Sequence, residues 1–294
     1  MKTIFYFYLA FAFASLSVSA ADKKIVLIAG KPSHGPGFHE HNAGVLLLKK
    51  CLDGVAGVKA EAHLNGWPED EKIFDGADAI VLYMDGGERH PAIQDNRLQN
   101  LDALMKRGVG LALLHYAVEP TIAKGEKEFL NWIGGAFEIN WSVNPHWDAE
   151  FKTLPKHPIT SGVTPFTLND EWYFNMRFRD GMKGVTPILT ALPPQSTMER
   201  GEGTHQGNPD VREKVKRGEP QHVAWASERE NGGRGFGFTG AHVHNNWGNE
   251  NFRKTVLNAI LWIAKADVPE NGVDCKITGE DLQQNLDPKG EKKK

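Results

Sequence analysis

The sequence has little of what marks several protein classes. Two cysteines in 294 residues cannot form a disulfide framework. The 34 lysines and arginines do not exceed the 37 aspartates and glutamates, and no basic stripe interrupts this balance. Nucleic acid is therefore not an expected partner, because it attracts clustered positive charge. Internal repeats and low-complexity linkers are absent, so one elaborated domain (21–268) with a tail (269–294) fits better than two domains.

The two cysteines are not expected to pair. Cys51 lies in the apolar helical stretch VLLLKKCLDG, where a cysteine usually packs as a small hydrophobic side chain. A chain of this length can bury a core without covalent links. Export would permit a disulfide between Cys51 and Cys275, but the sequence favours two unpaired cysteines.

Long apolar stretches are absent except at the N-terminus. Residues 1–20 combine one lysine, an uncharged apolar run, and Val18 and Ala20 in the positions that signal peptidase recognises. The alternative is an uncleaved anchor. We expect a signal peptide that is cleaved after Ala20, a mature protein without a membrane span, and a periplasmic or secreted location.

Apolar runs alternate with helical patterns in the first half of the chain. Strands are expected at 24–30, 58–64, 77–85 and 109–117, and helices at 41–54 and 91–108. This alternation predicts right-handed crossovers and a parallel sheet between two helical layers. The second half has strand-like segments between loops rich in proline and glycine, and it closes with an amphipathic helix at 248–266. We therefore expect an α/β fold with a mainly parallel sheet, an antiparallel extension and long loops.

Polar side chains follow the predicted strands where ligands bind in open parallel sheets, beyond the carboxyl ends. The first strand is followed by the loop KPSHGPGFHEHNAG, which holds three of the chain's 12 histidines. The other strands are followed by further histidines and carboxylates. In chain order these residues are His34, His39, His41, Asp85, His90, His115, Glu119, His242 and His244. They are distant in sequence, so their gathering at one edge of the sheet would indicate a functional site.

His115 stands where an apolar strand turns toward a helix. This is the position of a nucleophile elbow, but the flanking glycines and the serine or cysteine are missing. Acyl transfer is therefore poorly supported. The sequence leaves three roles open for His115: a general base, a metal ligand, or a histidine at the edge of the core that bonds a backbone carbonyl.

Three weaker patterns surround this edge. His242 and His244 would point to the same side of an extended segment, as two ligands of one metal ion do, although only one of them need face inward. Asp170 and Glu171 precede two aromatic residues, a setting that suits an acid or base but also a solvated strand end. Several tryptophans lie in loop-like segments, where they would either stack on sugars or pack the loops: Trp67, Trp141, Trp147, Trp172 and Trp247.

Five segments together resemble the trehalose-utilisation (ThuA-like) family. They are KIVLIAGKPSHGPGFHEHNAG, ADAIVLYMDGGERHP, GLALLHYAVE, NDEWYF and the segment from GFGFTGAHVHNNW to ENGV. The resemblance runs from about Lys24 to Val273. It implies the three-layer, flavodoxin-like fold of the class I glutamine amidotransferase-like superfamily. His115 stands at the approximate position of the amidotransferase nucleophilic cysteine, so glutamine hydrolysis is not implied.

The resemblance also implies carbohydrate metabolism, with sugars or keto-sugars as substrates. We expect an enzyme with three catalytic residues, His115, Glu171 and His34, and with three metal ligands, His34, His115 and His242. A divalent ion, with zinc favoured, suits these ligands, and no nucleotide cofactor is expected. The residues expected to bind substrate are Asp85, Tyr116, Trp172, Trp247 and Asn245. Hydrolase, lyase and isomerase chemistry all stay open. The alternative is a noncatalytic carbohydrate-binding protein that uses the same edge, and a homo-oligomer is compatible with both.

Overall fold

The four strands predicted in the first half of the chain pair side by side within a seven-stranded sheet. A computed structural model describes residues 21–289, so the predicted signal peptide and the last five residues lie outside the described part. The strands are β1 (Lys23–Ala29), β2 (Val58–His63), β3 (Ala79–Tyr83), β4 (Gly110–Leu114), β5 (Gly135–Ala136), β6 (Trp147–Phe151), β7 (Phe166–Asp170), β8 (Arg177–Phe178), β9 (Val185–Ala191), β10 (Gln221–Glu228) and β11 (Arg234–Phe238). The helices are α1 (His41–Leu52), α2 (Arg97–Lys106), α3 (Glu126–Trp132), α4 (Pro209–Lys216) and α5 (Glu250–Ile263).

The large sheet has the order β2-β1-β3-β4-β11-β10-β9. Strands β1, β2, β3, β4 and β11 are parallel, whereas β10 runs antiparallel to both of its neighbours. The predicted α/β fold with an antiparallel extension is therefore confirmed. The chain leaves β1 first for β2 on one side and then for β3 on the other, and a ligand site is expected at such a switch in strand order.

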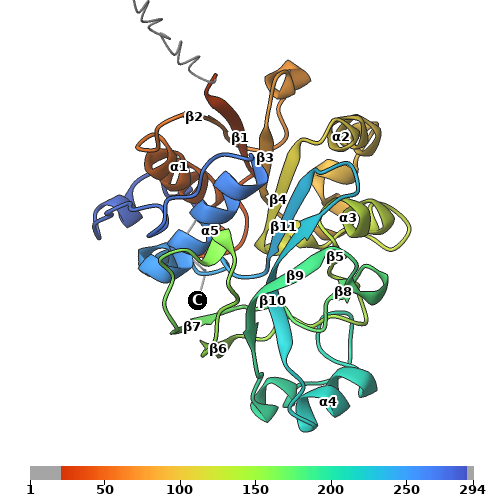
Figure 1. Cartoon of the computed structure of the whole chain (residues 1–294). Coiled ribbons are helices and arrows are strands. Elements are labelled where there is room, and N and C mark those ends of the chain that lie inside the picture. Colours follow the sequence, from red (N-terminus) through yellow and green to blue (C-terminus); the bar gives the residue numbers. More distant parts are fainter. Residues whose placement is uncertain (1–20, 290–294) are drawn as a thin grey trace, which may run out of the picture.

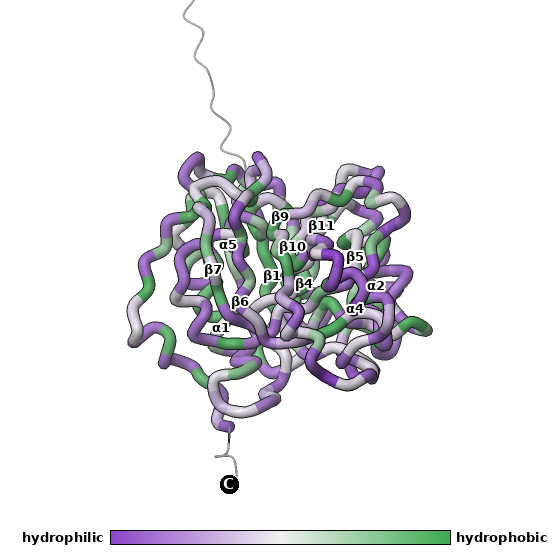
Figure 2. The backbone as a smooth tube through the Cα atoms, turned by 90° about the horizontal axis from the view of Figure 1, so that it is seen from below, coloured by the Kyte–Doolittle hydropathy of each residue, from purple (hydrophilic) through white to green (hydrophobic). Residues whose placement is uncertain are grey.

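Two helical layers cover the sheet because successive strand residues face opposite sides. Leu27 and Val81 pack in the core beneath α1 and α5, whereas Val26 and Ile80 pack in the core beneath α2 and α3. Figure 1 shows these helix pairs on opposite sides of the sheet. Figure 2 shows hydrophobic strands in the interior and mainly hydrophilic segments around them.

The predicted helix at 91–108 is shorter in the structure. Pro91–Ile93 forms a separate 3-10 turn, and His90 Nδ1 accepts a hydrogen bond from Ala92 N at its start. The backbone then takes the left-handed conformation at Asp95 (φ 50°), which interrupts helical geometry, and α2 begins at Arg97. His90 is buried and its Nε2 lies 3.0 Å from the Ala117 carbonyl, so its role is structural.

Trp172 and Trp247, which were predicted to bind substrate, are buried in the core. Both side chains are fully buried and pack edge-on against Phe252 of α5. Trp172 Nε1 also donates to the Leu168 carbonyl at 3.0 Å, so its polar atom is satisfied inside the protein. Neither ring can stack on a sugar. The surrounding polar residues suggested loops, but α5 lies over these loops and buries the tryptophans.

The expectation of unpaired cysteines is also wrong. Cys51 of α1 and Cys275 form a disulfide across 224 residues of sequence. After α5 the chain returns over α1, so the described part of the predicted tail packs on the domain and brings the cysteines together. Nothing local in the sequence reveals such a return. Within residues 21–289, no helix is both long enough and apolar enough to cross a membrane.

The glycine in the middle of β11 tests how tightly the sheet is packed. Gly237 faces Trp225 across the β10–β11 ladder, and a Cβ added to Gly237 would lie 2.1 Å from the indole ring. We expect Gly237→Ala to lower the free energy of unfolding by about 1–3 kcal/mol through overpacking. Gly54→Ala is the control, because its Cβ would meet an atom only at 3.6 Å, an ordinary contact. Urea denaturation measures both, and equal effects of the two substitutions would contradict this packing.

Candidate functional site

Two loops that follow parallel strands are joined by backbone hydrogen bonds. Phe38, after β1, forms a β-bridge with Val243, after β11. His39 N donates to the His242 carbonyl at 3.1 Å, and His244 N donates to the Gly37 carbonyl at 2.9 Å. This pairing places His39 and His242 side by side above the carboxyl ends of the sheet.

Several residues in these two loops and in the turn after β4 have an unfavourable backbone conformation. His34, His39 and His115 have φ values of 59°, 47° and 55°, and Ala241 has a φ of 85°. Residues other than glycine rarely adopt these φ values, and such backbone strain is concentrated at functional sites. At His115 the left-handed turn joins β4 directly to a 3-10 helix (His115–Val118) and points the imidazole at the cluster.

Three imidazole nitrogens meet at the centre of this edge. His39 Nε2 lies 2.9 Å from His242 Nδ1, and His115 Nε2 lies 3.1 and 3.2 Å from these two atoms. Glu171 Oε2 completes the group, 3.2 Å from His242 Nδ1 and 3.6 Å from His115 Nε2. Three of the histidines that follow the predicted strands, His39, His115 and His242, therefore meet at one edge of a mainly parallel sheet.

The outer hydrogen bonds of His39 and His115 fix their tautomers. His39 Nδ1 lies 2.7 Å from Asp85 Oδ1, and His115 Nδ1 lies 2.8 Å from the Thr239 carbonyl. Carbonyls and carboxylates only accept, so each Nδ1 carries the proton and each neutral ring presents an Nε2 lone pair. Burial lowers the pKa of both histidines, which keeps the rings neutral. Two lone pairs therefore converge with no proton between them.

This donor set fits a divalent metal ion. The ligand atoms of a tetrahedral zinc site lie about 3.3 Å apart when the bonds are about 2.0–2.1 Å long. The five separations given above, from 2.9 to 3.6 Å, lie around that value. Without an ion, the Tyr173 hydroxyl, 3.1 Å from His115 Nε2, can donate to that lone pair.

Asp170 holds the loop that carries His242. Its buried carboxylate accepts hydrogen bonds from the backbone N–H groups of Ala241, His242 and Val243 at 2.8, 3.1 and 3.1 Å. It also accepts from Glu171 N at 2.8 Å. One side chain therefore fixes both His242 and Glu171.

The loop after β1 contributes His39 to the centre in place of the predicted His34. The His34 side chain is 41% exposed, its ring stacks on His39, and its Nδ1 lies 3.9 Å from Asp85 Oδ1. The pairing of Phe38 with Val243 turns His39 inward and leaves His34 at the rim. His41 is buried behind Asp85, with its Nε2 3.7 Å from Asp85 Oδ1. His244 points away from His242, because the chain leaves the extended conformation after β11, and its Nε2 lies 3.1 Å from the Leu282 carbonyl.

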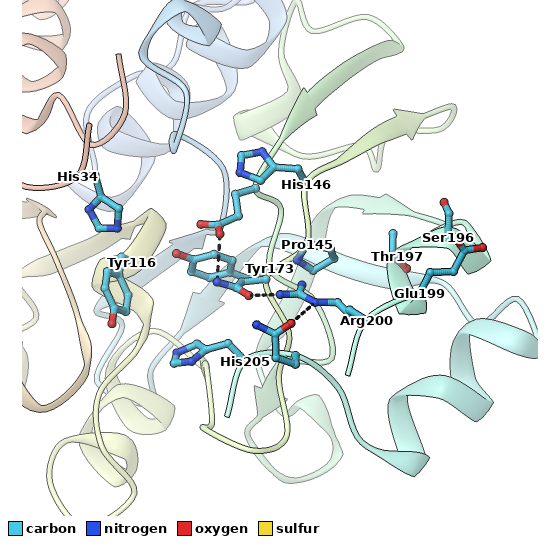
Figure 3. Close-up of a pocket in the computed structure, with 13 residues that line it drawn as sticks. His34, Tyr116, Pro145, His146, Tyr173, Ser196, Thr197, Glu199, Arg200 and His205 are labelled. Atoms are coloured by element: carbon cyan, nitrogen blue, oxygen red, sulfur yellow. Dashed lines mark hydrogen bonds between the residues drawn. The ribbon is translucent and has the colours of Figure 1, made fainter. Parts of the chain in front are cut away.

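A cavity of about 570 Å³ opens beside Glu171. Figure 3 shows His34 and Tyr116 on one side, Ser196, Thr197 and Glu199 on the other, and Tyr173 and Arg200 between them. Of the residues predicted to bind substrate, only Tyr116 lines this cavity. Asp85 instead orients His39, Trp172 and Trp247 are in the core, and Asn245 is exposed in a 3-10 helix, His244–Gly248.

The comparisons with known proteins agree with this architecture. The family model for trehalose utilisation, ThuA, matches residues 26–263. The chain belongs to the ThuA family. A crystal structure of a ThuA-like protein from Bacteroides uniformis ATCC 8492 is similar over 85% of this chain and 94% of its own, with a TM-score of 0.57 and 14% identity. The N-terminal domain of mmIFT52 is similar over 84% of this chain and all of its own, with a TM-score of 0.51 and 11% identity. No curated protein matches the chain.

At these identities the two structures support the fold alone. The ThuA family match supports a class I glutamine amidotransferase-like architecture with a role related to carbohydrates. The arrangement of His39, His115, His242 and Glu171 is described for this chain alone and is not taken from the two similar structures.

His205 and Arg200, which line the far wall of the cavity in this ThuA protein, were not predicted from the sequence. His205 Nε2 lies 2.9 and 3.0 Å from the two carboxylate oxygens of Glu119, which is almost fully buried. Arg200 donates to Asn144 at 3.2 Å, and Asn144 donates to Glu171 at 3.0 Å. His205 lies in the segment GEGTHQGNP. Like the first histidine loop, this segment combines histidine with glycine and proline, and that composition could have indicated His205.

The pair of Glu119 and His205 should be visible in a titration. The hydrogen bond to Glu119 raises the pKa of His205, although partial burial opposes this. The His205 imidazolium should therefore lose its proton at a higher pH than an ordinary histidine, whose pKa is about 6.5. Glu119→Gln removes the negative partner and should lower the pKa of His205. Histidine-resolved NMR between pH 5 and 9 measures the shift, with the exposed Glu69→Gln as the control, and an unchanged His205 pKa in Glu119→Gln would refute the pairing.

Proposed function

We propose that this ThuA protein is an exported, metal-dependent enzyme that acts on a glycoside or a keto-sugar. The convergence of His39, His115, His242 and Glu171 supports the proposal most strongly. Three imidazole nitrogens and one carboxylate, with the tautomers of His39 and His115 fixed, suit zinc. When bound, such an ion polarises a carbonyl or acidifies a water molecule.

The chain's own residues would move the proton. Nε2–H of His205 is held by Glu119, which leaves Nδ1 of the neutral ring, 3.2 Å from the Thr204 hydroxyl, to act as a base toward a ligand in the cavity that His205 lines. This resembles the way a carboxylate orients a catalytic histidine. Burial raises the pKa of Tyr173 and Tyr116, so their phenols stay protonated and act as hydrogen-bond donors. A metal-binding edge and an acid/base pair would thus share one cavity.

Polar contacts rather than tryptophan stacking would recognise the sugar. The cavity wall offers hydroxyl, amide, carboxylate and guanidinium groups, which suit a polyhydroxylated ligand: Tyr116, Asn144, Ser196, Thr197, Glu199, Arg200 and Gln206. Membership of the ThuA family supports a carbohydrate as the ligand class.

Export is supported by two independent features. Residues 1–20 have the composition of a signal peptide. The pairing of Cys51 and Cys275 favours an oxidising compartment, because cytosolic thiols are kept reduced.

Replacement of a central ligand should remove the metal. We expect purified protein without a histidine tag to hold about one zinc ion per chain, and His39→Ala to lose it. His146→Ala is a matched control, because His146 lines the cavity but does not belong to the cluster. Elemental analysis after exhaustive dialysis gives the stoichiometry. Equal metal content in both variants would contradict the assignment of His39.

Turnover separates the enzyme from a noncatalytic binding protein. We expect the zinc-loaded protein to consume a keto-sugar glycoside of 4-nitrophenol, and His205→Gln to lower kcat by about 10²–10⁴-fold with its zinc content unchanged. The products, followed by NMR, distinguish hydrolysis, elimination and isomerisation. Saturable binding of sugars without turnover would favour the carbohydrate-binding alternative.

A further inference from the structure

The C-terminal segment reaches the loop that carries His39, although it lies beyond the part of the chain that matches the ThuA family. We call residues 269–289 the strap. It crosses α1 and is held by the disulfide from Cys275 and by an ion pair of 2.5 Å between Lys50 and Asp281. The Leu282 carbonyl lies 3.1 Å from Nε2 of His244. The strap therefore contacts α1 and the loop after β11.

The end of the strap contacts the backbone of a proposed metal ligand. Lys289 Nζ donates to the carbonyl of Phe38 and, at 3.2 Å, to the carbonyl of His39. It also lies 3.2 Å from Glu40 Oε1. Asp287 N donates to Glu40 Oε2 at 2.8 Å. These contacts fix the three consecutive residues that include His39.

The contacts are buried, which makes them difficult to replace with water. The side chains of Lys289 and Glu40 are 5% and 2% exposed. Glu40 Oε1 also accepts from Gly37 N at 2.8 Å, so its carboxylate ties the glycine turn of the loop to the strap. A buried charge that loses its partner is strongly unfavourable. The loop should therefore shift when Lys289 is removed.

His39 needs such support because its own backbone does not favour the observed conformation. Its φ of 47° lies in the left-handed region, which persists in a non-glycine residue only where the surroundings hold it. The hydrogen bond from His39 N to the His242 carbonyl fixes the peptide group before His39. Lys289 donates to the His39 carbonyl and so fixes the peptide group after it.

We propose that the strap is a positioning device for the metal centre, in which Lys289 and Glu40 hold His39 Nε2 at the distance that the ion requires. This inference rests on the proposed metal site. It assigns a functional role to residues that follow the family-matched domain. Lys289 and Glu40 are positioning residues, because they act through the backbone of His39 and neighbouring residues and do not line the cavity.

Zinc affinity in variants of the full chain tests the proposal. Lys289→Met keeps the aliphatic stem but removes the charge, and we expect it to weaken zinc binding about 10- to 100-fold, as loss of an outer contact does. Lys289→Arg should restore most of the affinity. Lys276→Met is the matched control, because Lys276 is exposed on the same strap. Competition with a chromophoric chelator, well below the unfolding temperature, gives the dissociation constants. Affinities within twofold of one another in Lys289→Met and Lys276→Met would overturn the proposal.

Hydrogen exchange of the metal-free protein provides a readout that does not depend on zinc. We expect faster exchange of the amides at 37–41 in Lys289→Met than in Lys276→Met, with α5 unchanged in both. Equal exchange would refute the strap's role even if the parent protein bound zinc. If the parent protein bound no zinc, the metal centre itself would fail, and the strap's proposed function with it.

Discussion

Two imidazole nitrogens without protons, Nε2 of His39 and Nε2 of His115, lie 3.1 Å apart inside the protein, and the surrounding structure holds them there. Two neutral rings cannot form a hydrogen bond with each other through nitrogens that both lack a proton. Other contacts must therefore hold them in position. Asp85 and the Thr239 carbonyl hold the outer nitrogens. The bridge between the loops after β1 and β11 and the strap then hold the backbone of His39 in its left-handed conformation. A cation at the centre would turn this costly arrangement into a favourable one.

The fold and the location of the site could be predicted because both follow from local patterns. Fully apolar runs such as Leu111–Leu114 indicate strands buried on both faces, and parallel strands bring their carboxyl ends to one edge. His115 follows β4 directly, and Asp85 and His242 come within four residues of the ends of β3 and β11, so their presence at one edge of the sheet could be predicted without the loop conformations.

The residues that were missed depend on contacts between distant loops. The sequence does not show which histidine of the first loop turns inward, because that depends on the bridge from Phe38 to Val243. Trp247 looks like a loop residue until α5 packs over it. Cys51 and Cys275 meet only because the chain returns across α1. In each case the deciding partner lies in a different part of the chain, where periodicity and composition carry no signal.

Anomalous scattering from crystals grown with zinc tests whether the cluster of His39, His115, His242 and Glu171 binds a metal ion. Data collected on both sides of the zinc absorption edge locate the ion without assumptions about its ligands. We expect one strong peak within about 2.0–2.2 Å of His39 Nε2, His115 Nε2, His242 Nδ1 and a carboxylate oxygen of Glu171. A zinc peak only at other surface residues, with the three imidazoles hydrogen-bonded among themselves, would contradict it.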